Sequence, residues 1–194
     1  LLSIMENRAI TQAISEITAG NNQAFGVIYD TFIDQIYSFV YYRTSHTEIA
    51  EDLTSQVFLK ALEKIHQFSD KDTGSFSAWL YTIARNTVYD HYRTDKKMSD
   101  IDALWDMSSS EDVSENAAVS LSMQQVRDAL SKLSAEQQDI IVMRLWDGLT
   151  HSEIAAITGK TEASVKMIFS RSMRELRQHV PHTLLLLLIL KHLL

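Results

Sequence analysis

The chain has 194 residues, which is enough for one or two small hydrophobic cores, and it carries a formal net charge of −7. It contains no Cys, which excludes disulfides, thiolate zinc sites and a cysteine nucleophile and fits a reducing cytoplasm. Only five Gly and one Pro occur, and the apolar residues recur with a period close to 3.6. The composition therefore predicts an all-α protein.

Residues 1–21 precede the first strongly periodic segment and are interpreted as an N-terminal extension. The stretch Leu1–Met5 lacks the basic start and the apolar core of a secretory signal peptide. Met5 is a candidate for the natural start of translation.

Three helices are predicted at about 22–43, 46–67 and 76–97, and together they form a first helical lobe. The second helix has a wide apolar arc, whereas Leu59 lies alone on the opposite, polar face beside Asp52, Ser55 and Gln56. A single exposed leucine is normal on any protein surface, yet one among polar groups also suits a protein-binding face. The residues alone leave both interpretations open.

The third helix places basic and aromatic side chains together on its outer face. Phe76, Trp79 and the aliphatic residues after them form the predicted buried side. The predicted outer side carries Thr82, Arg85, Tyr89, Arg93 and Lys96, with Asn86 and Tyr92 on its flanks. Cations can follow a nucleic-acid backbone while aromatic rings stack on unpaired bases, so the mixture fits single-stranded nucleic acid. The polar loop 68–75 before this helix is suited to form the wall of a base pocket.

A Ser-rich acidic linker is predicted at residues 98–120. It holds six acidic residues and no basic one, so it carries −6 of the total charge of −7 and leaves −1 for the rest of the chain. By itself this composition is that of a solubilising tether between two lobes.

Residues 121–180 end in a predicted helix-turn-helix. Thr150 and Glu153 have the spacing of a capping box, Gly159 permits a tight turn, and Thr161 can cap a second helix that runs to about Gln178. One side of that helix is apolar, and the other carries Lys166, Ser170, Arg174 and Arg177, with Arg171 on the flank. A helix of this kind can enter the major groove of DNA, although a solvated amphipathic helix also has basic residues outside.

The tail 181–194 is apolar and spans only about 16 Å from Leu184 if it is helical, about half of a bilayer core. A surface anchor, a docking segment and a truncated or frame-shifted end remain open as interpretations. The seven His show no metal-ligand spacing and no Gly-rich phosphate loop occurs, so no metal, cofactor or enzymatic activity is predicted.

Two segments resemble the extracytoplasmic-function sigma factors of bacterial RNA polymerase, the smallest members of the sigma-70 superfamily. The first is Glu51–Leu62 followed by Phe76–Asn86, and the second is Leu133–Gln138 through Arg174. The resemblance implies a helical region 2 that binds core polymerase and melts the −10 element, an acidic flexible linker, and a region 4 helix-turn-helix that reads the −35 element. It also favours the protein-binding interpretation of the Leu59 face.

The resemblance implies site residues at matching positions. Asp52, Ser55, Gln56 and Leu59 fall in the helix that contacts the clamp helices of the largest polymerase subunit. The −10 site is implied to include Ser75, Phe76, Arg85, Asn86, Tyr89, Arg93 and Lys96, and the −35 site to include Lys166, Ser170, Arg171 and Arg174. Region 4 is implied to contact the flap of the second-largest subunit.

Two departures from the family pattern are visible. Ser55-Gln56 stands where members usually have Gln-Glu, which puts the clamp hydrogen bond in question. Met167-Ile168 stands where many have Ser-Arg, which predicts an unusual −35 preference. The family implies a cytoplasmic location and an anti-sigma partner able to hold the protein at the membrane. The main alternative is a stand-alone helix-turn-helix regulator, which would bind duplex DNA tightly without polymerase.

Overall fold

The computed structural model describes residues 2–69, 75–99, 125–126 and 128–179, and within these ranges the chain is helical with no strand. The all-α prediction is confirmed for this part of the protein. Residues 100–120 of the predicted linker 98–120 and the whole of the predicted tail 181–194 lie outside the described residues, as does most of the predicted loop 68–75. None of the helices in the described ranges is long and apolar enough to cross a membrane.

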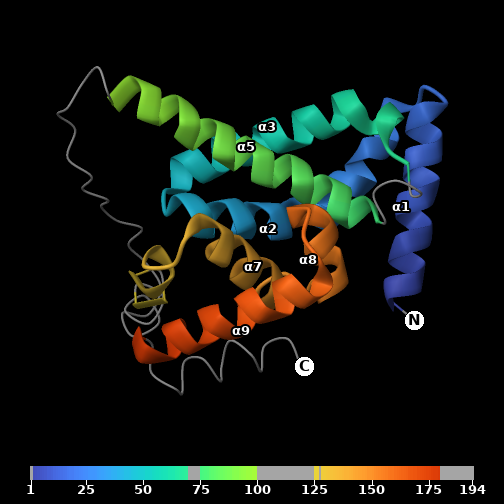
Figure 1. The fold of residues 1–194 in the computed structure, drawn as a ribbon. Helices are drawn as coiled ribbons and strands as arrows, with labels where there is room; N and C mark the ends of the chain where they lie inside the picture. The colour runs from blue at the N-terminus through green and yellow to red at the C-terminus, as the bar shows by residue number, and fades with distance from the viewer. Residues whose placement is uncertain (1, 70–74, 100–124, 127, 180–194) are drawn as a thin grey trace, which may run out of the picture.

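The first lobe is a bundle of three helices with a fourth against its end (Figure 1). The bundle contains α2 (Phe25–Thr44), α3 (Thr47–Lys64) and α5 (Phe76–Ser99), which pack against one another. Short 3-10 turns, η1 (Asn22–Ala24) and η2 (Ile65–Gln67), extend α2 and α3. The predicted helices at 22–43, 46–67 and 76–97 therefore agree with the observed elements to within a few residues.

Helix α1 (Leu2–Thr18) was not predicted and belongs to the first lobe. It packs against α2 and η2 and buries Ile10, Ala13 and Ile17. These three residues lie three and four positions apart, so they form one apolar stripe of a helix.

The second lobe is formed by α7 (Ala135–Leu145), α8 (His151–Thr158) and α9 (Glu162–His179). Capping boxes start α7 and α8, where Ser134 pairs with Gln137 and Thr150 pairs with Glu153. Gly159 ends α8 in the left-handed region at φ 67°, and Thr161 Oγ1 accepts a hydrogen bond from the Ser164 amide (3.2 Å). The predicted helix, turn and helix are thus present.

The two lobes pack directly against each other (Figure 1), and this packing was not predicted. Helix α5 contacts α8, and α2 contacts α7. One hydrophobic cluster runs through both lobes, because Ile154, Ala155 and Ile157 of α8 belong to the same cluster as Ile83 and Ala84 of α5. A second cluster holds the start of the second lobe to α7 and α9 and includes Leu130, Ile141 and Leu176.

Candidate polymerase and nucleic-acid interfaces

The outer face of α3 presents Leu59 to solvent, with 61 % of its surface exposed. Asp52 and Ser55 are also exposed, and Gln56 is half-buried. Gln56 Nε2 donates a hydrogen bond to Asp52 Oδ2 (2.8 Å), while Ser55 Oγ donates to the Glu51 carbonyl (2.9 Å). These polar side chains are therefore hydrogen-bonded within α3, and Leu59 is an exposed apolar side chain among them.

The start of α5 adjoins a cluster of aromatic rings. Phe76 lies 5.2 Å from Phe68, 5.3 Å from Trp79 and 5.7 Å from Phe32, measured between ring centroids, and is 6 % exposed. Ser75 Oγ accepts a hydrogen bond from the Ala78 amide (3.1 Å), so it caps the helix. Ser75 and Phe76 are thus held in place at the start of α5, and Asn86 is exposed farther along the same helix.

The remaining residues of the predicted −10 site do not share one open surface. Arg93 is exposed and pairs with Asp90 (3.0 Å), and Lys96 lies in α5 with its side chain outside the described part. Arg85 and Tyr89 face the second lobe instead. The prediction of a fully outward position was wrong for Arg85, whose side chain is only 21 % exposed because α7 lies against it.

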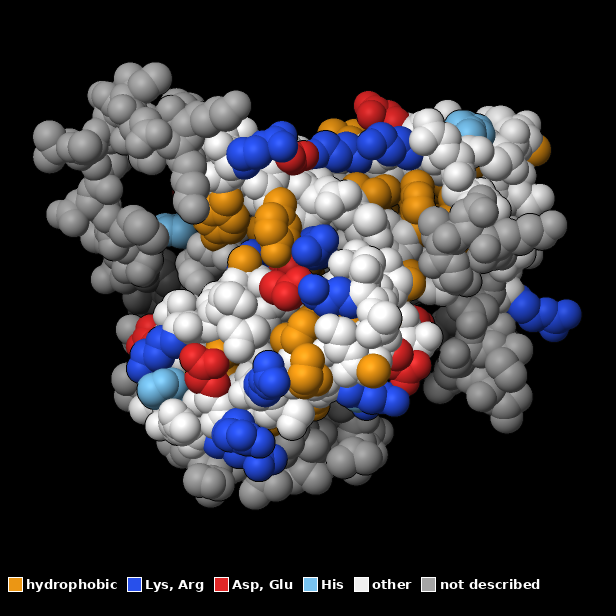
Figure 2. All heavy atoms as spheres, in the orientation of Figure 1, with side chains coloured by type: hydrophobic (Ala, Val, Ile, Leu, Met, Phe, Trp, Pro, Cys, Tyr) orange, Lys and Arg blue, Asp and Glu red, His pale blue; other side chains and the backbone are white. Residues whose placement is uncertain are grey.

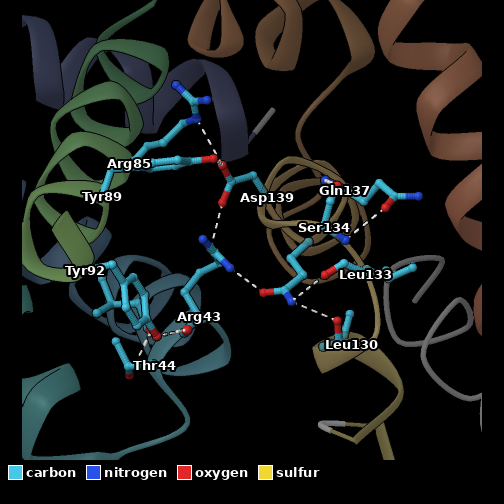
Figure 3. A network of polar contacts seen from close by, with 12 residues as sticks. Arg43, Thr44, Arg85, Tyr89, Tyr92, Leu130, Leu133, Ser134, Gln137 and Asp139 are labelled. Atoms are coloured by element: carbon cyan, nitrogen blue, oxygen red, sulfur yellow. Dashed lines mark hydrogen bonds and ion pairs between the residues drawn. The ribbon is translucent and has the colours of Figure 1, made fainter. Parts of the chain in front are cut away.

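The group that Arg85 and Tyr89 contact is Asp139 of α7 (Figure 3). Arg85 Nε donates to Asp139 Oδ2 (2.9 Å), and the Tyr89 hydroxyl donates to the same oxygen (3.2 Å). The other oxygen, Oδ1, forms an ion pair with Arg43 Nε at the end of α2 (2.8 Å). The Arg85 guanidinium also lies over the Tyr89 ring, 4.7 Å from its centroid. One carboxylate therefore joins three groups of the first lobe.

Neighbouring contacts hold the network in position. Arg43 Nη1 donates to Gln138 Oε1, and Gln138 Nε2 donates to the carbonyls of Leu130 (2.9 Å) and Leu133 (3.0 Å). The Tyr92 hydroxyl donates to the Arg43 carbonyl (2.6 Å). The network thus extends from the last turn of α2 to the segment that precedes α7.

Burial and neighbouring charges both shift the pKa values of the groups in this network. Burial raises the pKa of Asp139 above its ordinary value, although Arg43 and Arg85 oppose the rise. Burial likewise raises the pKa of Tyr89, with the charge of Asp139 adding to it. For Arg85 burial lowers the pKa, but the hydrogen bond and charge of Asp139 outweigh it, so the net pKa is raised.

A second acid, Asp147, lies at the same boundary without a cation. Burial raises its pKa well above 3.8, and the nearby Tyr81 hydroxyl of α5 lowers it only in part. Among the described residues, neither of its carboxylate oxygens has a hydrogen-bond partner of good geometry. Beside it, the rings of Tyr42 and Trp146 meet across the boundary with centroids 4.5 Å apart.

Helix α9 carries the predicted −35 residues on its solvent side, where Lys and Arg side chains are spread over the lower part of the molecule (Figure 2). Ser170, Arg171 and Arg174 are exposed, whereas Lys166 pairs with Glu162 (2.6 Å) on the same helix. Met167 is 47 % exposed among these polar groups. The helix therefore presents a cationic face with one apolar side chain in it.

Sequence reasoning missed Arg43, Asp139, Tyr81 and Asp147. Asp139 directly precedes the buried run Ile140–Met143, and an acid that begins a buried run was the available signal. The partners of Asp139 lie in the other lobe, fifty or more positions away in the sequence, and no local pattern identifies them.

The family model of Sigma-70 region 2 matches residues 28–98, and that of Sigma-70 region 4 matches residues 123–176. The ECF RNA polymerase sigma factor BldN of Streptomyces coelicolor is 34 % identical over 179 residues, which is 91 % of this chain and 67 % of that protein. The ECF RNA polymerase sigma factor SigW of Bacillus subtilis is 28 % identical over 88 % of this chain and 96 % of its own length.

Two solved structures match most of this chain. The sigma factor RpoE of Bartonella quintana, in complex with the anti-sigma factor NepR, has a TM-score of 0.68 and 28 % identity over 79 % of this chain and 94 % of that one. CnrH in complex with the cytosolic domain of CnrY has a TM-score of 0.66 and 22 % identity over 88 % and 94 %, which shows the shared fold. Two matched sigma regions in family order, together with the BldN likeness, place this chain in the family of extracytoplasmic-function RNA polymerase sigma factors, which act in transcription initiation.

Proposed function

We propose that the two lobes divide the work of a sigma factor as follows. The α3 face with Asp52, Ser55, Gln56 and Leu59 binds the clamp helices of core RNA polymerase. The start and outer face of α5 capture and melt the −10 element, and α9 reads the −35 element. The observation that carries the proposal is the presence of both sigma regions, in order, in one chain with the basic face of α9 open to solvent.

The proposal assigns roles to ranges of the chain. Residues 22–97 act as region 2, 98–120 as an acidic linker through the polymerase cleft, and 121–180 as region 4 on the flap of the second-largest subunit. Helix α1 stabilises region 2 by covering α2 and η2. The chain has no catalytic activity of its own in this scheme.

A partner of the anti-sigma type is also proposed, with a cytoplasmic site of action. RpoE of Bartonella quintana was solved with an anti-sigma factor and matches 79 % of this chain.

Run-off transcription tests the proposal. Core polymerase with the added chain is expected to start at specific sites on genomic promoter fragments, whereas core alone does not. Tight binding of duplex operator DNA by the isolated chain, with no stimulation of core polymerase, would favour the stand-alone regulator.

A further inference from the structure

Arg43, Arg85 and Tyr89 form a site that has the chemistry of an anion receptor (Figure 3). Two guanidinium groups and one phenol converge on Asp139, which is the only acid they contact within the described part of the chain. Guanidinium groups bind phosphate as readily as carboxylate, and a ring with a cation above it can stack on an unpaired base.

The acid in this site comes from the other lobe. Asp139 lies on α7, whereas its three partners lie on α2 and α5. The side chains of Arg43 and Asp139 are 5 % and 0 % exposed, so separation of the lobes would bring both into water. The first lobe would then present two unpaired cations beside Tyr89.

We propose that Arg43, Arg85 and Tyr89 bind the backbone of a single DNA strand, and that Asp139 occupies this site in the closed molecule in place of a phosphate. The inference deepens the proposed function and rests on it, since it assigns Arg43 to the melting lobe and makes Asp139 an internal competitor of promoter DNA. Helix α7 must therefore move away from α2 and α5 before the DNA strand can bind to these three side chains.

The energetics allow such an exchange. A fully buried carboxylate loses its hydration, and its ion pairs return only part of that free energy, so the contact is specific without being strong. A strand that places a phosphate on the two guanidinium groups releases counterions and adds stacking on Tyr89. Gln138 also links Arg43 to the segment before α7, so departure of α7 from α2 breaks this contact as well.

Binding of a probe strand by the full chain tests the site. The probe is a fluorescein-labelled, thymidine-rich 12-mer, and fluorescence anisotropy is measured over a series of salt concentrations. Asp139→Asn is expected to bind at least about tenfold more tightly than the unmodified chain. The control Asp128→Asn removes the same charge from an exposed position of the same lobe and is expected to change affinity little.

Arg43 is then changed in the Asp139→Asn background. Arg43→Met is expected to remove most of the gain and to reduce the slope of log K against log salt by about 0.7, the value for one phosphate contact on a single strand. Arg43→Lys is expected to retain the slope. Equal affinities of Asp139→Asn and Asp128→Asn, or a gain that survives Arg43→Met, would overturn the proposal.

A distance measurement tests the exchange itself. The chain has no Cys, so Glu63→Cys and Gln178→Cys place one spin label on an exposed position of each lobe. The probe strand is expected to shift the distance distribution to longer values, and Asp139→Asn to shift it before the strand is added. Strand binding with an unchanged distribution would show that Asp139 and DNA do not compete.

The holoenzyme separates this inference from the proposed function. If core polymerase with the unmodified chain fails to initiate at any promoter, the proposed function is wrong. If that holoenzyme initiates, but the Arg43→Met holoenzyme binds a pre-melted promoter as tightly as the unmodified one, the proposed function stands and the inference fails.

Discussion

Two acids at the lobe boundary show how the surroundings of a side chain decide its role. Asp139 contacts two guanidinium groups and a phenol, whereas Asp147 lies beside the phenol of Tyr81 without a cation. Burial penalises the charge of both carboxylates, but only Asp139 recovers part of the loss from opposite charges. Asp139 therefore connects the two lobes. Ionisation of the Asp147 carboxyl, by contrast, lowers the stability of the folded molecule.

The first prediction follows from the raised pKa of Asp147. A group that binds its proton more tightly in the folded state contributes stability that is fully present below its ordinary pKa of 3.8 and is lost as the pH rises through the raised value. Urea unfolding of Asp147→Asn is expected to show a smaller loss of stability over this pH range than the unmodified chain. Asp139→Asn serves as a comparison, since its raised pKa acts in the same direction but its removal also breaks two ion pairs. Identical pH profiles for Asp147→Asn and the unmodified chain would contradict the assignment.

The second prediction concerns Leu59, the most exposed large apolar side chain in the described residues. Leu59→Asp adds a charge at a position that is already in water, so thermal unfolding is expected to change little while co-purification with core polymerase is lost. Val27→Asp is the matched control, because Val27 is 43 % exposed on α2 and lies outside the proposed clamp face. If both variants lose polymerase binding to the same extent, or if neither loses it, Leu59 is an ordinary surface residue.

At the scale of single elements, the sequence was informative wherever a helix is specified locally. The Thr150–Glu153 capping pair, Gly159 and the apolar period of α3, α5 and α9 predicted these helices and the turn before α9 closely, because each signal lies within a few residues of the structure it determines. Helix α1 was missed although Ile10, Ala13 and Ile17 are correctly spaced. Its buried stripe is narrow, so the pattern is visible only with its partner α2 in place.

The third prediction separates the two proposed DNA sites. Arg174→Ala removes an exposed cation from α9, so it is expected to weaken closed-complex binding and to flatten its salt dependence by about one counterion. Asn86→Ala, at an exposed position of the proposed −10 site on α5, is expected to leave duplex binding nearly normal and to slow strand opening. Permanganate footprinting measures the opening, and the exposed Lys64→Ala on α3 is the control for general loss of charge.

A template with a pre-melted −10 bubble distinguishes the two losses. The bubble supplies the unpaired bases in advance, so it is expected to rescue part of the Asn86→Ala defect and little of the Arg174→Ala defect. Equal rescue of both variants would mean that melting and anchoring are assigned to the wrong lobes.

At the scale of the whole molecule, the relation between the lobes could not be predicted. Arg85 and Tyr89 have the spacing of an exposed helical face, but Asp139 of α7 contacts both side chains and Arg85 is left only 21 % exposed. The contacts that close the molecule join residues about fifty or more positions apart, and helical periodicity carries no information on such pairs. The aromatic contact of Tyr42 with Trp146 is of the same kind.

The last prediction is that the closed molecule unfolds as one unit. One hydrophobic cluster contains residues of α5 and of α8, so neither lobe can unfold without exposing apolar surface of the other. The chain has three Trp, of which Trp79 lies in the first lobe and Trp146 in the second. Trp105→Phe combined with Trp146→Phe leaves Trp79 as the single reporter of the first lobe. Trp105→Phe combined with Trp79→Phe leaves Trp146 as the single reporter of the second lobe.

Each variant is unfolded in urea and followed by both far-UV circular dichroism and its single tryptophan. Within a variant the two midpoints are expected to coincide, since the reporter and the bulk helix content then follow one transition. Asp139→Asn in both backgrounds is expected to open a gap between the tryptophan and helix midpoints, because the contact that joins α7 to α2 and α5 is weakened. A gap that already exists without this substitution would show that the lobes are independent in solution and that Asp139 does not hold them together.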